Sequence, residues 1–279
     1  MTQIPVHYKD RRKEGDTVLR QCQLAQLHLL YVFDRICKDH GLQYVLEGGT
    51  LLGAMRHDGF IPWDDDLDVG MPQKDYEQFL RIAPKSLPVD VRLCLPSQTP
   101  WTAIPFAKLR DVYSFYGETR PDMTTADPSG IYIDIFPYEE LPKLPRPIQN
   151  VLARVCSCSW MRMKFFYGKC RRGFLPCQFY SLIGLAFSVV HAMTRLMVWL
   201  LKHCLPSSDY CLGLECIWHY RFPKRVMFPA GLHRFEDGEF PVPADADAVL
   251  KIEYGDWHWI PPPEKRPRHA RIIDPFHAA

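Results

Sequence analysis

The sequence predicts an α+β fold, in which a mixed β-sheet is flanked by helices and interrupted by a mainly helical insertion. Helix-like and strand-like patterns alternate over the first 140 residues, as expected for a sheet covered by helices. A long segment, 141–208, contains neither Asp nor Glu, so its composition differs from that of the rest of the chain. The 279 residues, 47% of them hydrophobic, suffice to bury a substantial core.

The individual elements follow from hydrophobic spacing and from turn residues. Apolar residues recur at helical spacing over 17–40, and Gly41 follows as a stop signal, so we expect an amphipathic helix. Residues 42–49 are aromatic and branched and end in two glycines, which predicts a strand, a tight turn and a short helix over 50–57. The later elements are expected as strands over 66–71, 89–95, 104–112 and 131–136, and as helices over 73–83, 146–168, 178–204 and 244–255.

These patterns divide the chain into three parts. Residues 1–140 form the expected core, and residues 141–222 form a basic, mainly helical insertion. Residues 223–279 are expected to pack back on the core, with the proline-rich stretch 259–269 as an extended arm.

The charge balance excludes some classes of protein. Lys and Arg number 34 and Asp and Glu number 32, so the net charge of +2 does not suit a nucleic-acid binder with one basic field. The N-terminal residues contain no apolar signal core, and we therefore expect a cytoplasmic protein whose cysteines are reduced. A zinc site could use Cys204, Cys211, Cys216 and His219, although buried thiols explain the same residues more simply.

The insertion is basic, and one of its predicted helices is strongly apolar. Ten Lys and Arg residues lie in 141–208, where no acid balances them. Residues 182–201 have the length of a membrane span, but Arg195 lies well inside this stretch and makes spanning costly. The alternatives are a buried core helix and a helix in the interface of an anionic membrane, held there by the neighbouring basic residues. The last arrangement places the protein at the periphery of the inner membrane face.

A run of acidic residues is the sharpest local feature. Asp64, Asp66 and Asp68 alternate along the chain, and on a strand Asp66 and Asp68 point to the same side. Carboxylates on one face repel one another unless a cation lies between them. Oxygen ligands suit a hard divalent ion, so we expect Mg²⁺ or Mn²⁺. The alternative is a solvated acidic turn.

Two further features strengthen the metal interpretation. Asp134 stands alone in an apolar strand, where an ionised carboxylate needs a partner. If this strand lies beside 66–71, Asp134 joins Asp66 and Asp68; otherwise an ion pair with an Arg explains it. Upstream, Gly48, Gly49 and Thr50 form a turn whose backbone N–H groups can approach a phosphate.

This order of motifs resembles the nucleotidyltransferase fold of the DNA polymerase beta type, although the spacing from Gly49 to Asp66 is longer than usual there. The segments EGGTLLGAMRHDGFIPWDDDLDVGMPQKDYEQFL, FAKLRD, GIYIDIFP and FPVPADADAVLKIEYGDWHWIPPPEKR are similar to the LicD family. The resemblance covers about residues 20–270 and is weakest in 141–222. That family includes bacterial phosphocholine transferases and, more distantly, fukutin-type ribitol-phosphate transferases.

The resemblance implies a phosphotransferase that moves a phosphorylated alcohol from a CDP-activated donor to a hydroxyl of a glycan or lipid-linked glycan. The implied acceptors are precursors of lipopolysaccharide, teichoic acid or capsule. Asp66, Asp68 and Asp134 would hold the metal, and Asp134 or, less readily, Asp64 would take the proton of the attacking hydroxyl. The remaining implied site residues are Gly48, Gly49 and Thr50 for donor phosphate and Arg56, Lys108 and Arg110 for the charge on the leaving CMP.

Other functions remain open from the residues. A metal-dependent glycosyltransferase also uses an Asp-x-Asp motif, but normally has a complete nucleotide-binding βαβ half before it. A calcium loop starting at Asp64 fails because Val69 replaces its glycine and Asp75 replaces its bidentate glutamate. A non-catalytic scaffold at an anionic membrane surface is favoured only by the basic insertion. Trp63, Trp101, Trp257 and Trp259 could form an aromatic cage, with His57 and Glu47 nearby, but do not assign choline.

Overall fold

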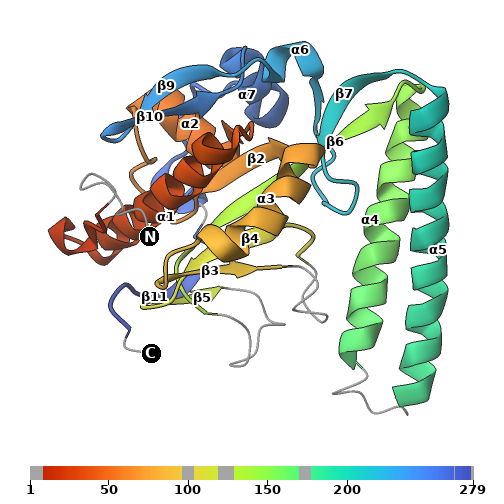
Figure 1. Cartoon of the computed structure of the whole chain (residues 1–279), viewed down its shortest axis with the longest axis horizontal. Coiled ribbons are helices and arrows are strands. Elements are labelled where there is room, and N and C mark those ends of the chain that lie inside the picture. The colour runs from red at the N-terminus through yellow and green to blue at the C-terminus, as the bar shows by residue number, and fades with distance from the viewer. Residues whose placement is uncertain (1–8, 96–103, 119–128, 170–176, 267, 278–279) are drawn as a thin grey trace. The chain divides into compact units, whose positions relative to one another are not determined.

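The computed structural model describes residues 9–95, 104–118, 129–169, 177–266 and 268–277 (Figure 1). The chain forms two compact units. The first, here called the core unit, comprises Met1–Cys94, Ala107–Phe136 and Arg225–Ala279. The second, here called the helical unit, comprises Leu95–Phe106 and Pro137–Lys224. The division into 1–140, 141–222 and 223–279 stays a prediction of domain boundaries.

A sheet forms the centre of the core unit. Its strands lie in the order β1 (Val45–Leu46), β2 (Asp68–Pro72), β6 (Tyr132–Pro142), β4 (Ala107–Asp111) and β3 (Val91–Cys94). Strand β1 pairs antiparallel with β2, and β4 pairs antiparallel with both β3 and β6. The order places β2 next to β6, which brings two distant acidic segments together. The predicted α+β class is confirmed.

Helices pack against this sheet and end where local signals predict. Helix α1 (Val18–His40) begins after Thr17, whose hydroxyl accepts a hydrogen bond from the Arg20 backbone N–H, and it ends at Gly41 with φ 63°. It contacts β4 and α3 (Gln73–Ser86), while α3 also contacts β2 and β3. Helix α7 (Ala246–Tyr254) contacts α2 (Gly48–His57), which lies against β2.

Several boundaries differ from those predicted. Helix α2 starts at Gly48, two residues early, so both glycines belong to its first turn instead of a preceding loop. Strand β2 starts at Asp68, and Asp66 lies in the segment just before it. The side chain of Asp66 accepts a hydrogen bond from the Leu67 N–H at 3.1 Å, which uses a donor that a strand partner would otherwise take.

Six strands and three short helices had no clear sequence signal. Strands β9 (Gly231–Phe235) and β10 (Gly238–Val242) form an antiparallel hairpin. Strand β11 (Ala270–Asp274) continues the proline-rich tail and pairs antiparallel with β5 (Phe115–Glu118). The tail was predicted as extended, and it contains one short helical turn at η3 (Pro263–Lys265). The other unpredicted elements are η2 (Arg12–Glu14), η3 (Pro263–Lys265), α6 (Lys224–Met227), β7 (Ser207–Leu212) and β8 (Arg221–Pro223).

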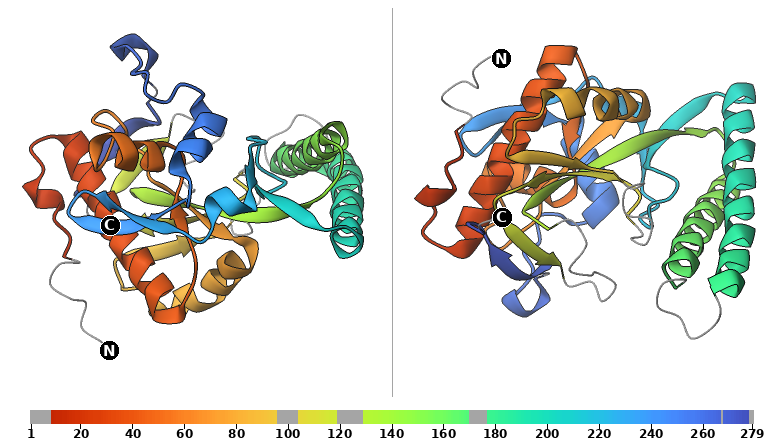
Figure 2. Two further views of the ribbon diagram at one scale, coloured as in Figure 1. Left: turned by 90° about the horizontal axis from the view of Figure 1, so that it is seen from above. Right: turned by 60° about the horizontal axis from the view of Figure 1, so that its bottom comes forward.

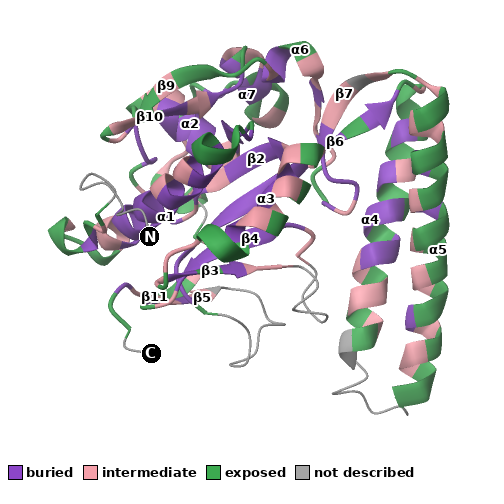
Figure 3. Cartoon of the chain, in the orientation of Figure 1, coloured by how far each residue is buried: buried purple, intermediate pink, exposed green. Residues whose placement is uncertain are grey.

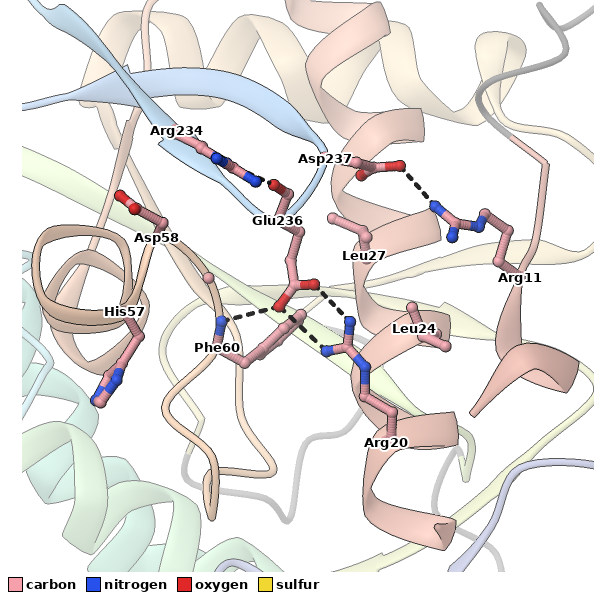
Figure 4. A pocket seen from close by; sticks show the side chains of 11 residues that line it. Arg11, Arg20, Leu24, Leu27, His57, Asp58, Phe60, Arg234, Glu236 and Asp237 are labelled. Carbon is pink, nitrogen blue, oxygen red and sulfur yellow. Dashed lines mark hydrogen bonds and ion pairs between the residues drawn. The ribbon is translucent and has the colours of Figure 1, made fainter. Parts of the chain in front are cut away.

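Ion pairs fasten the β9–β10 hairpin to the N-terminal part of the core unit, around a cavity of about 390 Å³ (Figure 4). Glu236, in the hairpin turn, accepts hydrogen bonds from the guanidinium of Arg20 and from the Phe60 N–H. Arg11 pairs with Asp237 at 2.7 Å. Because these charges neutralise one another, the cavity walls are held together by their own ion pairs.

The helical unit contains two long helices, α4 (Arg146–Lys169) and α5 (Cys177–Cys204), as predicted. They pack against each other and run side by side in both views of Figure 2. Strand β7 pairs with the second half of β6, and β8 pairs with β7. The shared core consists of Leu141, Ala153, Cys156, Val198, Cys211 and Leu214.

Helix α5 is the one helix of the described residues that is long and apolar enough to cross a membrane. Only 17% of its most apolar stretch is buried, so the buried core helix considered from the sequence is wrong. Cys211 and Cys216 are buried, while Cys204 is exposed. Within the described residues, Cys204, Cys211, Cys216 and His219 do not form a metal-ligand group.

Candidate active site

Three carboxylates from distant parts of the chain converge in the core unit. Ligand oxygens of Asp66, Asp68 and Asp134 all lie within 4.8 Å of one another. Asp68 is the first residue of β2, and Asp134 is the third residue of the neighbouring strand β6. The Asp134 N–H donates to the Leu67 carbonyl oxygen at 2.9 Å, which fixes the two segments side by side.

The alternation of polar and apolar residues explains why these side chains share one face. Leu67 and Val69 are fully buried, so the residues between and before them point to the opposite side. Asp134 is 6% exposed, while Asp66 and Asp68 are half-buried. The structure therefore brings together the three residues that the sequence singled out as metal ligands.

The electrostatics of this cluster call for a cation. Burial raises the pKa of Asp68 well above its usual value, and the nearby charges of Asp66 and Asp134 raise it further. Burial also raises the pKa of Asp66, although Lys108 opposes the shift. A group that contains only carboxylate oxygens suits Mg²⁺ or Mn²⁺, so these residues fit the divalent ion expected from the sequence.

Lys108 is a predicted cationic site residue that contacts the carboxylate cluster. It stands opposite Asp134 in the β4–β6 register, and its Nζ lies 2.7 Å from Asp134 Oδ1. The same ammonium group lies 3.3 Å from the centre of the Tyr132 ring. An ion pair of Asp134 was the alternative to metal binding; the structure shows both the pair, with a lysine, and the carboxylate cluster.

Arg110 is buried two residues further along β4. Its Nη1 donates to the Gly130 carbonyl oxygen at 2.9 Å, and its guanidinium lies over the Tyr132 ring. The structure thus places Arg110 beside Tyr132 and uses one of its donors to hold the chain at the start of β6.

The glycines bring the N-terminus of α2 against the acidic segment. A Cβ on Gly49 would lie 2.8 Å from Asp64 Oδ2, and Gly48 adopts φ +52°, which favours glycine. The hydroxyl of Thr50 accepts a hydrogen bond from the Asp68 N–H at 2.8 Å. Gly48, Gly49 and Thr50 therefore position α2 next to the carboxylates.

His269 is a site residue that the sequence analysis missed. Its Nδ1 lies 3.0 Å from Asp65 Oδ1 and 4.0 Å from oxygens of both Asp64 and Asp66. The hydrogen bond to Asp65 raises the pKa of His269 to about 9. Burial raises the pKa of Asp64 to about 6. The one available signal was indirect, because a run of partly buried acids requires nearby cations.

Asp65 anchors the C-terminal arm through this histidine. Besides His269, its carboxylate accepts the Ala270 N–H at 3.0 Å. Burial alone would raise the pKa of Asp65, but these hydrogen bonds outweigh it and lower the pKa. Gln26 and Tyr116 donate to the Asp65 carbonyl oxygen at 2.8 and 3.3 Å, so the acidic segment is held from several sides.

Arg56 lies at the other end of α2 from the carboxylates. It is eight positions beyond Gly48, about 12 Å along a helix axis. Its Nη1 donates to the carbonyl oxygens of Trp257 and Trp259 at 3.2 and 3.4 Å. In the structure Arg56 holds the 257–259 segment, and its role toward a donor stays a prediction.

The tryptophans do not form one cage in the described residues. The Trp63 ring lies 3.8 Å from the Arg266 guanidinium, so it already faces a cation. Trp257 stacks on His258, and its Nε1 donates to Asp247. Trp101 lies outside the described residues.

The calcium-loop alternative does not fit this geometry. A helix–loop–helix unit would need helices on both sides of the acidic run, whereas residues 64–67 lead directly into β2. The glycosyltransferase alternative is not favoured either, because α1 and the two-residue strand β1 are the main elements before α2.

Comparison with known proteins finds a family match over the part of the chain that contains the site. Residues 41–144, which hold the three carboxylates, match the family described as LicD/FKTN/FKRP, nucleotidyltransferase domain. The lipopolysaccharide cholinephosphotransferase LicD of Haemophilus influenzae is 29% identical over 272 residues, which cover 90% of this chain and 96% of that protein. The ribitol 5-phosphate transferase FKRP of human and mouse is 57% identical over 35 residues, 12% of this chain and 7% of that protein.

The nearly complete alignment with one transferase and the domain match around the acidic cluster point to the same conclusion. Over residues 41–144 the chain is therefore similar to the LicD family, and it is a transferase.

Proposed function

We propose that the chain transfers a phosphorylated alcohol, phosphocholine or a similar group, from a CDP-activated donor to a hydroxyl of a cell-surface glycan. The observation that carries this proposal is the convergence of Asp66, Asp68 and Asp134 beside Lys108. Phosphoryl transfer needs positioning and charge stabilisation more than covalent chemistry, and such a cluster supplies both.

The carboxylate cluster would hold Mg²⁺ or Mn²⁺. When bound, the ion would neutralise negative charge on the donor diphosphate. Three carboxylates against the ammonium group of Lys108 leave net negative charge among these four residues, which a divalent ion would offset. Burial raises the pKa values of Asp66 and Asp68, and the like charges around them raise these values further when only protein groups surround them.

The proposed reaction is a displacement at the phosphorus that carries the alcohol. The acceptor hydroxyl oxygen forms a bond to that phosphorus, and the bond from phosphorus to the oxygen bridging to CMP breaks. CMP leaves with the bridging oxygen and both bonding electrons. The hydroxyl proton passes to a carboxylate, for which Asp134 is the first candidate and Asp64 the second. The product is a phosphodiester between the alcohol and the glycan.

The chain's other residues have supporting roles in this proposal. The N-terminus of α2 at Gly48 and Gly49 would receive a donor phosphate, because free N–H groups gather at a helix start. Lys108 pairs with Asp134, its Nζ 2.7 Å from Asp134 Oδ1. Arg110 and Arg56 are the proposed cations for the leaving CMP.

The relatives guide the choice of donor and acceptor. One is named as a lipopolysaccharide cholinephosphotransferase and another as a ribitol 5-phosphate transferase. We therefore propose a CDP-alcohol donor and a glycan or lipid-linked glycan acceptor, such as a precursor of lipopolysaccharide, teichoic acid or capsule. That the protein acts in the cytoplasm stays a prediction.

A thermal-shift panel tests the donor. CDP-choline, CDP-ribitol, CDP-glycerol and UDP- and GDP-sugars are each added with and without Mg²⁺, because a ligand that binds the native state raises the melting temperature. We expect a shift from at least one CDP-alcohol, dependent on Mg²⁺. A shift from a nucleotide sugar, with every CDP-alcohol silent, would instead favour a glycosyltransferase.

Release of CMP tests the chemistry. Asp68→Asn should abolish release from the stabilising donor in the presence of acceptor and Mg²⁺, while Asp256→Asn should match the wild type because its side chain is 80% exposed outside the cluster. Equal activity of the two variants would contradict the proposal, and zero activity of every protein would favour the non-catalytic scaffold.

A further inference from the structure

Helix α5 directs charged side chains toward the protein and apolar side chains outward. A surface helix of a soluble protein does the reverse. Arg195 Nη1 lies 2.7 and 2.9 Å from the two carboxylate oxygens of Glu139 in β6. Lys202 Nζ lies 3.1 Å from the same carboxylate, and His191 Nε2 lies 3.4 Å from Glu215. These charged and titratable side chains of the helix therefore face the rest of the helical unit.

The opposite side of α5 is apolar and open to its surroundings. A stripe at spacings of three and four residues, here called the outer face, consists of Phe179, Leu182, Leu185, Val189, Met193 and Leu196. Each of them is at least 50% exposed, and Leu182 and Met193 reach 66%. In Figure 3 the exposed colour dominates along α5. A continuous apolar stripe of this kind marks an interaction surface.

The charge of the segment indicates which partner covers this face. Residues 141–208 carry ten Lys and Arg and no acid, and two of the ten, Arg195 and Lys202, pair with Glu139 outside this segment. An anionic lipid bilayer complements both properties, because acyl chains accept the apolar stripe and headgroups attract the basic residues. A second copy of this chain would bring two acid-free, positively charged segments together, which like-charge repulsion opposes.

The inward charges also argue for a helix that lies on the bilayer and against one that crosses it. Arg195 and Lys202 share the buried carboxylate of Glu139, so one side of α5 is fastened to protein over its last three turns. A spanning helix would have to expose this side to lipid or carry the pairs into the membrane, at high cost. A helix with a single free apolar face suits the interface.

We propose that α5 lies along the surface of an anionic lipid bilayer, with its outer face in the boundary between headgroups and acyl chains. This proposal does not rest on the proposed chemistry. It gives the protein a surface for lipid, separate from the carboxylate cluster of the core unit.

Vesicle flotation tests the proposal with the full chain. We expect the wild type to float with vesicles of phosphatidylcholine and phosphatidylglycerol, and to float at least tenfold less with phosphatidylcholine alone. The double variant Leu182→Glu with Met193→Glu should lose anionic-vesicle binding at least tenfold. The control Leu232→Glu changes a residue of β9 that is 65% exposed, and it should bind like the wild type.

Two further measurements keep the outcome clear. Circular dichroism and thermal melts should show that the double variant folds, since both changed residues are exposed. Brominated lipids should quench wild-type fluorescence more than that of Trp199→Phe, because Trp199 lies on α5 and is 55% exposed. Vesicle binding unchanged by the double variant would overturn the proposal. A vesicle-independent dimer that the double variant dissociates would overturn it too, as would association that resists alkaline extraction.

Discussion

Lys108 and Asp134 face each other across β4 and β6, with Nζ 2.7 Å from Oδ1. Both side chains are buried, at 4% and 8% exposure. The pair stands at the edge of the carboxylate cluster, where Asp134 also approaches Asp66 and Asp68. Lys108 thus stabilises one carboxylate of the three and leaves the remaining negative charge for a divalent ion.

The first prediction separates the structural role of this pair from its catalytic role. Lys108→Met leaves Asp134 buried without its ammonium partner, so we expect a loss of about 3 kcal/mol in the free energy of unfolding and at least ~100-fold in turnover. The double variant Lys108→Met with Asp134→Leu should recover most of the stability, because two apolar side chains replace a buried pair, but none of the activity. Urea unfolding and CMP release measure the two quantities. Recovery of activity in the double variant would show that the pair serves the fold alone.

The second prediction concerns metal binding. Adding Mg²⁺ at ~100 times its dissociation constant should stabilise the wild type by about 2.7 kcal/mol. Asp68→Asn should abolish this gain. In EDTA, however, the variant should melt at a higher temperature than the wild type, because it removes one of three repelling carboxylates. Thermal melts with EDTA and with Mg²⁺ measure both effects. Equal stabilisation of the two proteins by Mg²⁺ would rule out Asp68 as a metal ligand.

The third prediction tests the close approach of α2 to the acidic segment. In Gly49→Ala the new methyl group would lie 2.8 Å from Asp64 Oδ2, so the carboxylate must move. We expect kcat/KM for the donor to fall at least ~10-fold, while stability changes by less than about 1 kcal/mol, since alanine favours the helix. In the matched control Gly231→Ala, the nearest atom to the added methyl would be 3.9 Å away. The control should keep full activity; an unchanged Gly49→Ala enzyme would remove the glycine from the site.

Much of the site could be predicted because its acidic residues stand among apolar residues in the sequence. Asp134 interrupts an apolar strand, and Asp66 and Asp68 alternate with Leu67 and Val69, which are fully buried. Such conflicts between pattern and chemistry mark functional positions. The sequence did not indicate His269, because its position beside Asp65 depends on the pairing of β11 with β5, a contact between segments far apart in the chain.

The fold, like the site, was predictable where the signals are local and was not where an element depends on contacts between distant segments. The limits of α1 were predictable because Thr17 and Gly41 provide local caps. The hairpin β9–β10 was not predicted, since Glu236 occupies a turn position with φ 59° where Gly or Asn is the usual signal. Arg20 and Phe60 bind the Glu236 carboxylate and hold this turn by tertiary contacts. The open outer face of α5 was likewise not evident, because composition does not show which way Arg195 points.

The last prediction uses two glutamates of the helical unit, buried Glu139 and half-buried Glu215, that respond to pH in opposite directions. Burial alone would raise the pKa of Glu139, but Arg195 and Lys202 outweigh it and lower the pKa. Its contribution to stability is therefore present above about pH 4.5 and is lost as the pH falls through its lowered folded-state pKa. Burial raises the pKa of Glu215, and the charge of Glu139 adds to this despite the opposing effect of Arg195. The contribution of Glu215 is present at acid pH and is lost as the pH rises.

At pH 7 the isosteric variants Glu139→Gln and Glu215→Gln should therefore affect the free energy of unfolding differently. Glu139→Gln should lower the free energy of unfolding by about 2 kcal/mol, less than for a fully buried pair because Arg195 is 36% exposed. Its deficit should shrink as the pH falls below 4.5, where the wild type loses the same charge. Glu215→Gln should be at least as stable as the wild type at pH 7 and should lose that advantage at acid pH. Urea unfolding of the three proteins between pH 3.5 and 8 measures these differences. If the free energies of unfolding of the two variants changed with pH in parallel, Arg195 would not act differently on the carboxylates of Glu139 and Glu215. The charged side of α5 would then need another explanation.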